Sequence, residues 1–446
     1  MARADRPSAP PSPSFGAYVA AAHAAGRLVV QPRMGLSDPA GMRAGLMATK
    51  SAAATTAGTI TVDSYTRLGQ HEAARKALAN GAPLNGYPIV LRGPATTESV
   101  LRGVMGPDFP VQVRHGAPDP RAIVSALIAA GLDATEGGPV SYCLPYSRTP
   151  LDASITAWSA ACRELAATTG TGRRPHLETF GGCMLGQLCP PSMLVALSVL
   201  EACFFRHHGI TDVSLSYAQQ TSPDQDIEAV NALARIAEER LGDIDRHIVV
   251  YAYMGVYPQT ATGARLLLRE AVRLAVRTGS ARLIVKTASE ASRIPTVAEN
   301  VHALEIAAAF AEDLRHDAVS HGAAVPAEGT VEREARALVD AVLELDPDVG
   351  RALLTAFRRG YLDVPFCLHP DNAGRTRAAI DSDGRLRWTA LGALPISDIA
   401  DINGARPMHS TELMTALTYV RRRYDQESPR DASRGDSPPS SRNVAS

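Results

Sequence analysis

Three arginines stand at the ends of short hydrophobic runs of strand character. Arg33 follows "LVVQP", Arg67 follows "TITVDSYT" and Arg114 follows "PVQV". A guanidinium grips a carboxylate through two parallel charge-assisted hydrogen bonds and stays charged when it is desolvated. The recurrence of arginine at such positions predicts a binding site for a small molecule with more than one carboxylate.

Arginine is abundant in this chain, which weakens the argument for any single one. Of the 45 lysine and arginine residues, only Lys50, Lys76 and Lys286 are lysines. For one arginine, a loop position beside an acidic partner is an equally good interpretation. That interpretation is much weaker for all three together, because each of them follows a strand-like run.

Acidic and phenolic side chains occupy similar positions along the sequence. Glu136 in "ATEGG" could accept hydrogen bonds from an ammonium group, and Tyr142 and Tyr146 in "SYCLPYS" could contact the same molecule. His115 directly follows the third arginine and is a further candidate for substrate binding. Other polar residues that follow strand-like runs are Glu178, Tyr217, Tyr253, Tyr257, Lys286 and Glu290. Such a set suits a small zwitterion with more than one carboxylate.

These side chains can share one site only if the strands before them end on the same side of a sheet. The nine segments of strand character are "LVVQP" from Leu28, "TITVDSY" from Thr59, "PIVLR" from Pro88, "PVQVRHG" from Pro110, "PVSYCLP" from Pro139, "PHLETFG" from Pro175, "DVSLSYA" from Asp212, "HIVVYAYMG" from His247 and "RLIVKTA" from Arg282. Amphipathic segments such as 226–241 and 263–278 separate them. This alternation, with a count near eight, predicts an α/β fold, the (β/α)8 TIM barrel, with one candidate irregular and the active site at the C-terminal strand ends.

Composition divides the rest of the chain. Residues 1–14 and 425–446 are poor in apolar residues and rich in Pro, Ser, Arg and Asp, which predicts disordered tails. Residues 15–295 form the predicted barrel domain. The sequence is helical in character from about 296 to 360 and then alternates loops with short strands, so 296–424 are expected to form an α/β extension packed on the barrel.

Charge, hydropathy and cysteine content argue against several classes of function. The formal net charge is -1 and the longest apolar stretches have strand length, so neither nucleic acid nor membrane is expected as a partner. The first residues lack a hydrophobic signal segment, which favours a cytoplasmic protein. The six cysteines have no zinc-like spacing, so we expect buried, reduced thiols and no metal site. Glycine-rich phosphate-binding motifs are also absent from the sequence.

Seven strings, in the order given, resemble the large subunit of glutamate mutase, also called methylaspartate mutase: "QPRMG", "TVDSYTR", "PLNGYP", "VRHGAPD", "EGGPVSYCLPY", "MGVYPQ" and "IVKTASEASRIPT". The resemblance runs from about residue 26 to about residue 405. It implies the catalytic subunit of an isomerase that interconverts L-glutamate and (2S,3S)-3-methylaspartate by adenosylcobalamin-dependent radical chemistry. In this family a small partner subunit carries cobalamin on an Asp-x-His-x-x-Gly motif, which this sequence lacks. The resemblance therefore implies such a partner, and a homodimer of this chain within a heterotetramer.

The same resemblance assigns roles to individual residues. Arg33, Arg67 and Arg114 match the family's carboxylate-binding trio, Glu136 the acid that accepts from the substrate amino group, and Tyr142 and Tyr146 phenols that contact substrate. The implied cofactor contacts are Gly35, Asn85, Pro145, Tyr257, Lys286, Glu290 and Ile294. The sequence departs from the family pattern at Tyr257, where phenylalanine is expected, at Arg282, where lysine is expected, and at Cys143 and Leu144.

Two other functions are compatible with the sequence. In a cofactor-free barrel lyase or aldolase, Lys286 would form a Schiff base with a keto acid, since it lies in a hydrophobic run where burial would lower the pKa of its amine. A catalytically inactive barrel could instead serve as a scaffold subunit. The complete set of three arginines and Glu136 counts against the second alternative, because a scaffold has no physical need for three guanidiniums in one mouth.

Overall fold

Eight short parallel strands form one sheet in the order β1-β8-β7-β6-β5-β4-β3-β2. The computed structural model describes residues 14–184, 188–319, 328–400, 402 and 410–427. The strands are β1 Val29–Gln31, β2 Gly58–Thr61, β3 Val111–Arg114, β4 Ala134–Gly137, β5 His176–Thr179, β6 Asp212–Ala218, β7 Asp245–Tyr251 and β8 Arg282–Ile284. A parallel bridge between Val30 and Thr56 joins β1 to the segment before β2 and closes the barrel. The predicted (β/α)8 TIM barrel is confirmed.

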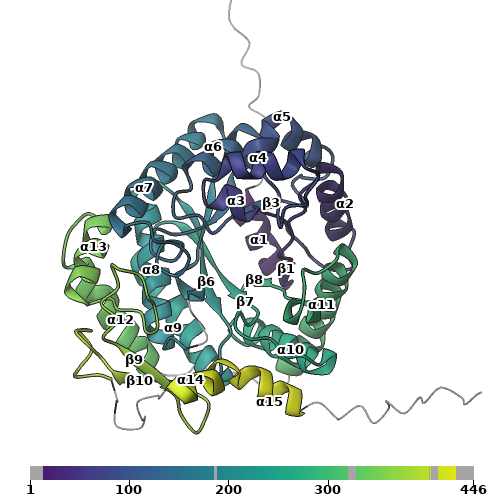
Figure 1. Cartoon of the computed structure of the whole chain (residues 1–446). Helices are drawn as coiled ribbons and strands as arrows, with labels where there is room; N and C mark the ends of the chain where they lie inside the picture. Colours follow the sequence, from purple (N-terminus) through teal and green to yellow (C-terminus); the bar gives the residue numbers. More distant parts are fainter. Residues whose placement is uncertain (1–13, 185–187, 320–327, 401, 403–409, 428–446) are drawn as a thin grey trace, which may run out of the picture.

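Helices surround the strands as a ring (Figure 1). Those of the barrel are α1 Phe15–Ala24, α2 Pro39–Lys50, α3 Ser64–Arg67, α4 His71–Ala79, α5 Ile89–Leu101, α6 Arg121–Ala129, α7 Leu151–Ala167, α8 Pro191–His207, α9 Pro223–Leu241, α10 Ala261–Arg277 and α11 Val297–Val319, with 3-10 turns η1 Thr168–Thr171, η2 Gly181–Cys183 and η3 Ala288–Ala291. The predicted helices at 226–241 and 263–278 correspond to α9 and α10. In α10, Leu267, Leu268 and Ala271 are buried, as the amphipathic pattern requires.

Two predicted strands are wrong and one strand was missed. The segment "PIVLR" forms the start of α5. Val90 and Leu91 are only half-buried, as on one side of a surface helix. The β-rich composition of this segment therefore does not determine its structure. The segment "PVSYCLP" forms turns, with Tyr142 N donating to Gly138 O and Leu144 N to Val140 O. Strand β4 was missed because "ATEG" has low β-propensity, but its register with β5 fixes it in the sheet.

Helix α1 closes the N-terminal end of the barrel. It packs against β1, β6 and β7, and its Phe15 ring stacks on His176 with 5.0 Å between centroids. Ser14 caps this helix by accepting from Ala17 N at 3.1 Å and is buried. Ser14 was assigned to the predicted N-terminal tail, whose other residues lie outside the described ones. The N-terminal end of the barrel is thus covered by α1.

The remaining elements pack outside the ring. They are α12 Thr330–Leu343, α13 Val349–Arg359, the antiparallel pair β9 Arg377–Ile380 and β10 Leu386–Ala390, α14 Ser410–Leu417 and α15 Tyr419–Glu427. Helix α12 packs on α8 and α9, and α15 packs on α10 (Figure 1). Two expected boundaries move: α11 packs between α10 and α2 as part of the ring, beyond residue 295, and α15 continues past residue 425.

Candidate active site

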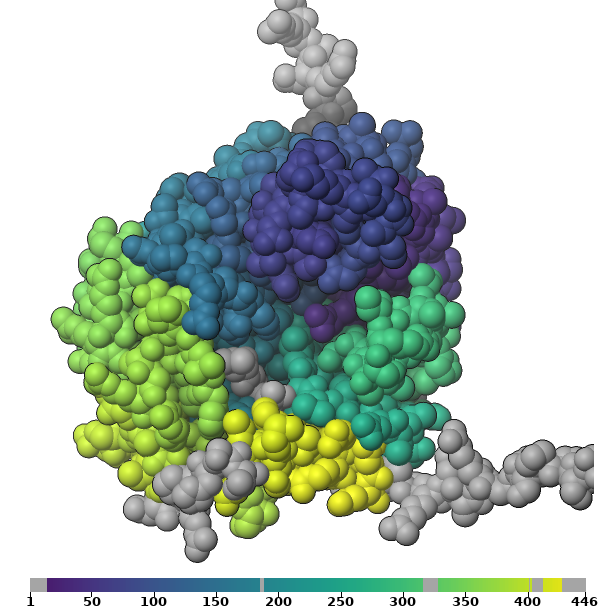
Figure 2. All heavy atoms as spheres, in the orientation of Figure 1, coloured from purple at the N-terminus to yellow at the C-terminus, as the bar shows by residue number. Residues whose placement is uncertain are grey.

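The predicted substrate residues come to one end of the barrel. Arg114 ends β3, Glu136 lies in β4, and Arg67 ends helix α3, which follows β2. Tyr142 and Tyr146 lie in the loop between β4 and α7. The surface is hollowed here, in the middle of the ring of helices (Figure 2). This hollow is called the mouth.

Arg114 and Glu136 form a buried ion pair in the mouth. Arg114 Nη2 lies 2.6 Å from Glu136 Oε2, and the two side chains are 4% and 2% exposed. Tyr142 donates its hydroxyl proton to Glu136 Oε1. Burial raises the pKa of Glu136, and the guanidinium of Arg114 opposes that rise. A cation, a carboxylate and a phenol are therefore held in contact by the protein alone.

Glu178, Tyr251 and Arg282 continue this cluster into the barrel interior. Tyr251 donates to Glu178 Oε1 and accepts from Arg114 Nη2 at 2.8 Å. Arg282 donates to Glu178 Oε2. Burial would raise the pKa of Glu178, but the guanidiniums of Arg282 and Arg114 outweigh it and lower that pKa to about 2. These three residues, Arg114 and Glu136 are called the floor.

Arg33, Arg67 and Tyr146 are more accessible and are called the rim. Both arginines are half-buried, and Tyr146 is 41% exposed. Their guanidiniums act electrostatically on the Tyr146 hydroxyl, whose pKa desolvation raises to about 12. Among the described residues, neither arginine has a hydrogen-bond or ion-pair partner, and Arg67 Nε is buried without one.

A glycine and a buried glutamate position the loop after β4. Gly137 has a φ of +133°, and a Cβ there would lie 2.6 Å from the Tyr142 ring, so only glycine lets that ring approach the strand end. Glu201 of α8 accepts from Ser141 N at 2.9 Å and from Gly181 N at 2.8 Å. Its carboxylate joins the loop after β4 to the loop after β5.

A C-terminal segment holds the other end of the loop 142–149. His369 Nε2 donates to Thr149 O at 2.9 Å, and Asp371 Oδ2 accepts from Leu151 N at 2.8 Å. His369 Nδ1 accepts from Asp371 N at 3.1 Å, so the proton of the neutral ring is on Nε2. The segment after α13 therefore fixes the start of α7 and, through it, the loop that carries Tyr142.

The nearby cysteine is not an activated nucleophile. Cys143 Sγ lies 3.8 Å from His369 Nε2, but that nitrogen donates its proton to a backbone carbonyl. Burial raises the pKa of the Cys143 thiol to about 11. All six cysteines are buried and free, as the sequence predicts. In the described part of the chain, we find no group of three or more His, Cys, Asp or Glu that could hold a metal ion.

His115 lies behind Tyr142. Its ring centroid is 5.3 Å from that of Tyr142 and 5.7 Å from that of Trp158, and its Nδ1 accepts from Ala117 N at 3.0 Å. Burial and the neighbouring Arg114 lower the pKa of His115 to about 3, so the ring is neutral. Its assignment to the substrate remains a prediction.

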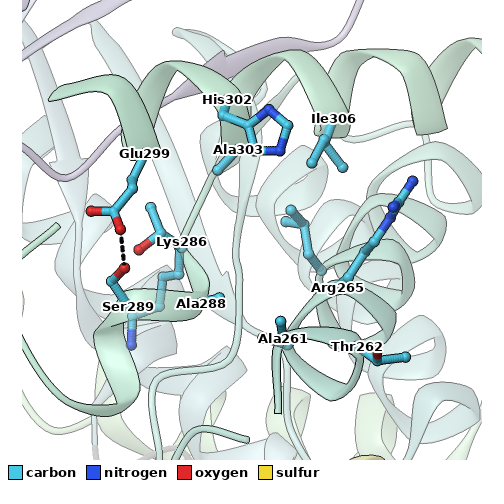
Figure 3. Close-up of a pocket in the computed structure, with 13 residues that line it drawn as sticks. Ala261, Thr262, Arg265, Lys286, Ala288, Ser289, Glu299, His302, Ala303 and Ile306 are labelled. Atoms are coloured by element: carbon cyan, nitrogen blue, oxygen red, sulfur yellow. Dashed lines mark hydrogen bonds between the residues drawn. The ribbon is translucent and has the colours of Figure 1, made fainter. Parts of the chain in front are cut away.

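Three of the seven predicted cofactor residues lie together where the loops after β7 and β8 meet. Lys286 Nζ is 3.3 Å from Glu290 Oε2 and 5.1 Å from the centre of the Tyr257 ring. Burial lowers the pKa of Lys286, and Glu290 opposes this. Lys286 also borders a pocket of about 440 Å³, lined by residues of α10 and α11 such as Arg265 and His302 (Figure 3). The amine proposed for a Schiff base is thus already paired with a carboxylate.

The other four predicted cofactor residues differ in their surroundings. Gly35 packs on β2 so closely that a Cβ would lie 2.2 Å from Thr61 O. Asn85 is exposed, and its Oδ1 accepts from the first N–H of α3 at 2.9 Å. Pro145 is half-buried and Ile294 is 65% exposed. Their contact with a cofactor remains a prediction.

Sequence reasoning misplaced two phenols and overlooked a third. Tyr217 donates to Asp226 Oδ1 of α9 at 2.9 Å and so faces the helices, and Tyr253 packs with Leu267 of α10. Tyr251, which is a member of the floor, was overlooked. Tyr251 and Tyr253 are two residues apart, so alternation along a strand assigns them to the same face, and they differ because β7 ends at Tyr251.

Comparison with known proteins agrees with the resemblance. The family model described as "Methylaspartate mutase E chain (MutE)" matches residues 9–412. The glutamate mutase epsilon subunit of Halobacterium salinarum is 34% identical over 346 residues, which cover 76% of this chain and 72% of that protein. The epsilon subunit of Haloarcula marismortui is 32% identical over 78% of this chain and 72% of its own, and that of Escherichia coli O157:H7 is 30% identical over 77% and 73%.

Proposed function

Because this chain belongs to the methylaspartate mutase E chain family, we propose that it is the catalytic subunit of an isomerase that interconverts L-glutamate and (2S,3S)-3-methylaspartate. One observation carries the proposal beyond the family name. The guanidiniums of Arg33 and Arg67, which have no partner among the described residues, share a mouth with the buried ion pair of Arg114 and Glu136. Together these four side chains offer donors for two carboxylates and an acceptor for one ammonium group.

The charge of the mouth suits a dicarboxylic amino acid. Three arginines and Glu136 leave an excess of positive charge, while glutamate carries two carboxylates and one ammonium group. A substrate carboxylate can replace Glu136 as the partner of Arg114. The substrate ammonium group can then pair with Glu136, so every charge keeps a partner of opposite sign. In a desolvated site, such complementarity favours this class of molecule over monocarboxylic amino acids.

The arginines can also hold the parts of the substrate in position during the rearrangement. A group that migrates along the carbon skeleton must leave one carbon and rejoin another without diffusing away. Each part of the substrate keeps one carboxylate, so separate guanidiniums can hold both parts in register. The floor supplies one fixed clamp in Arg114, and the rim supplies the others.

The family implies adenosylcobalamin as cofactor, and the residues near β8 fit part of it. The pair of Lys286 and Glu290 offers donors and an acceptor for the hydroxyl groups of a nucleoside, with the Tyr257 ring beside them. The buried hydroxyl of Thr287 has no partner among the described residues. Contacts from Gly35, Asn85, Pro145 and Ile294 would complete the binding surface. When bound, the cofactor supplies the radical that removes a substrate hydrogen.

Partner subunits follow from the same proposal. Since the sequence lacks the Asp-x-His-x-x-Gly motif, a separate small subunit would bring the cobalamin to the mouth, and two copies of this chain would form the centre of a heterotetramer. The chain itself would position the substrate and exclude water. Among the described residues, no helix has the length and apolar character needed to cross a membrane.

Reconstitution tests the proposed function directly. This chain is mixed with a candidate cobalamin-binding subunit, adenosylcobalamin and L-glutamate, and the methyl doublet of methylaspartate is followed by NMR. We expect the doublet only when both subunits are present. Formation of product by this chain with cofactor alone would refute the need for a partner. Borohydride trapping of a substrate adduct on Lys286 would favour the lyase instead.

A further inference from the structure

Arg282, the member of the floor on β8, lies in a fully buried polar layer. Its side chain is 0% exposed, and its guanidinium lies 4.9 Å from the centre of the Phe15 ring of α1. Nη1 donates to Gln31 Oε1 at 2.5 Å and Gln112 Oε1 at 3.3 Å, and Nη2 donates to Ser214 Oγ at 2.9 Å. This guanidinium is held by fixed acceptors on four strands and cannot reach the mouth itself.

Glu178 links this layer to the residues that face the substrate. Its Oε2 accepts from Arg282 and from Gln112 Nε2, the latter at 3.1 Å. Its Oε1 accepts from Tyr251 and lies 3.5 Å from Arg114 Nη1. The two oxygens of one carboxylate therefore face two different guanidiniums.

The register of the barrel makes a second cation necessary. Glu136 and Glu178 are direct neighbours on β4 and β5, and both are fully enclosed. Two ionised carboxylates that are neighbours in a buried site repel each other, and a cation beside each of them offsets this repulsion. Because Arg282 pairs with Glu178, Arg114 is available to pair with Glu136.

Building on the proposed function, we infer that Arg282 is a positioning residue that acts through Glu178 to keep Arg114 directed at the substrate carboxylate. Without Arg282, a buried and unpaired Glu178 would draw Arg114 across the short gap to Oε1. Arg114 would then lose its alignment with Glu136 and with the substrate. A lysine at this position would supply the same charge without the fork.

The proposal gives a distinctive pH dependence. The titratable or charged groups that face Glu178 are Arg282 of β8, Arg114 of β3, Tyr251 of β7, Glu136 of β4 and Cys183 of η2. Removing Arg282 removes the largest influence that lowers the pKa of Glu178, so this pKa rises. At a pH below this new pKa, Glu178 is neutral and does not attract Arg114 away from Glu136. Above it, Glu178 competes for Arg114, so the defect grows as the pH rises.

The test compares Arg282→Gln, Arg282→Lys and the double variant Arg282→Gln with Glu178→Gln in the reconstituted enzyme. We expect Arg282→Gln to raise the KM for glutamate and to lower kcat/KM by roughly 30-fold or more at pH 8, with a smaller loss at lower pH. Arg282→Lys should stay within about fivefold of wild type, since it keeps the charge. The double variant restores neutrality and should recover several-fold activity and lose the pH dependence.

The control is Arg174→Gln, which removes an arginine from the exposed ion pair with Asp245 near the other end of the barrel. It should leave kcat/KM and KM unchanged. A purely structural role for Arg282 would lower the melting temperature and the active fraction of Arg282→Gln but leave its KM and pH profile as in the control, which would overturn the inference. A crystal structure of Arg282→Gln gives a readout that needs no turnover. Arg114 should shift from Glu136 to Glu178, and an unmoved Arg114 would reject the inference even if the wild type proved inactive on glutamate.

Discussion

The floor and the rim of the mouth both contain arginines, but within the described ranges only those of the floor have ion-pair partners. Arg114 and Arg282 contact buried carboxylates and have almost no exposed surface. Arg33 and Arg67 are half-buried and, in the part of the chain that the structure describes, have no acceptor. The floor is a closed network of charges, and the rim is open to a ligand.

This difference separates stability from binding. A buried ion pair that loses one member leaves the other charge without compensation, which is strongly destabilising. An unpaired, half-exposed arginine can be changed with little effect on the fold. Floor substitutions should therefore alter both stability and activity, whereas rim substitutions should alter activity alone.

The largest effect is expected for Arg114→Lys. A lysine cannot contact Glu136, Tyr251 and a substrate carboxylate together, so turnover should fall by roughly 10²- to 10³-fold. Stability should also fall, by about 2 kcal/mol, because Glu136 and Glu178 lose part of their shared cation. Turnover by NMR and urea unfolding of the same preparation measure the two effects. A variant with wild-type stability would show that the floor is not a coupled network.

From sequence alone, Arg33, Arg67 and Arg114 are indistinguishable, since each follows a strand-like run. Strand ends and the α/β alternation could be predicted because they depend on local composition. The ion pair of Arg114 and Glu136 could not, because it requires the register of β3 and β4, and β4 itself has a sequence of weak β-propensity. Arg282 was noted only as a departure from the family, because its depth in the barrel is a tertiary property.

The rim arginines should show the next largest effect. Arg67→Lys and Arg33→Lys keep the charge but lose the fork, and we expect each to lower turnover by roughly 10²-fold. The melting temperature should stay within about 1 °C of wild type, because neither guanidinium has a hydrogen-bond or ion-pair partner among the described residues. Arg121→Lys is a matched control, since Arg121 is an exposed arginine that pairs with Asp119 on the surface. Normal turnover in both rim variants would remove them from the site.

Glu136→Gln should have a smaller effect than the arginine variants. The amide still accepts from Tyr142 but no longer balances the substrate ammonium group, which costs about 2 kcal/mol, or roughly 30-fold in kcat/KM. In this variant Arg114 keeps its ion pair with Glu178. The free energy of unfolding should therefore change less than in Arg114→Lys. Steady-state kinetics with glutamate measures the first quantity. Unchanged KM and kcat would exclude Glu136 from substrate binding.

Tyr257→Phe should have the smallest effect of all, and it sharpens the comparison because Tyr257 is buried like the floor but unpaired like the rim. Its hydroxyl has no hydrogen-bond partner among the described residues, and burial raises the pKa of that hydroxyl well above its ordinary value. A buried hydroxyl without a partner costs stability, so its removal should raise the free energy of unfolding by about 1 kcal/mol. The ring beside Lys286 is retained, so kcat/KM should stay within about twofold of wild type. If phenylalanine instead lowers both stability and activity, the Tyr257 hydroxyl has a partner in the assembled enzyme, and Tyr257 resembles the paired residues of the floor.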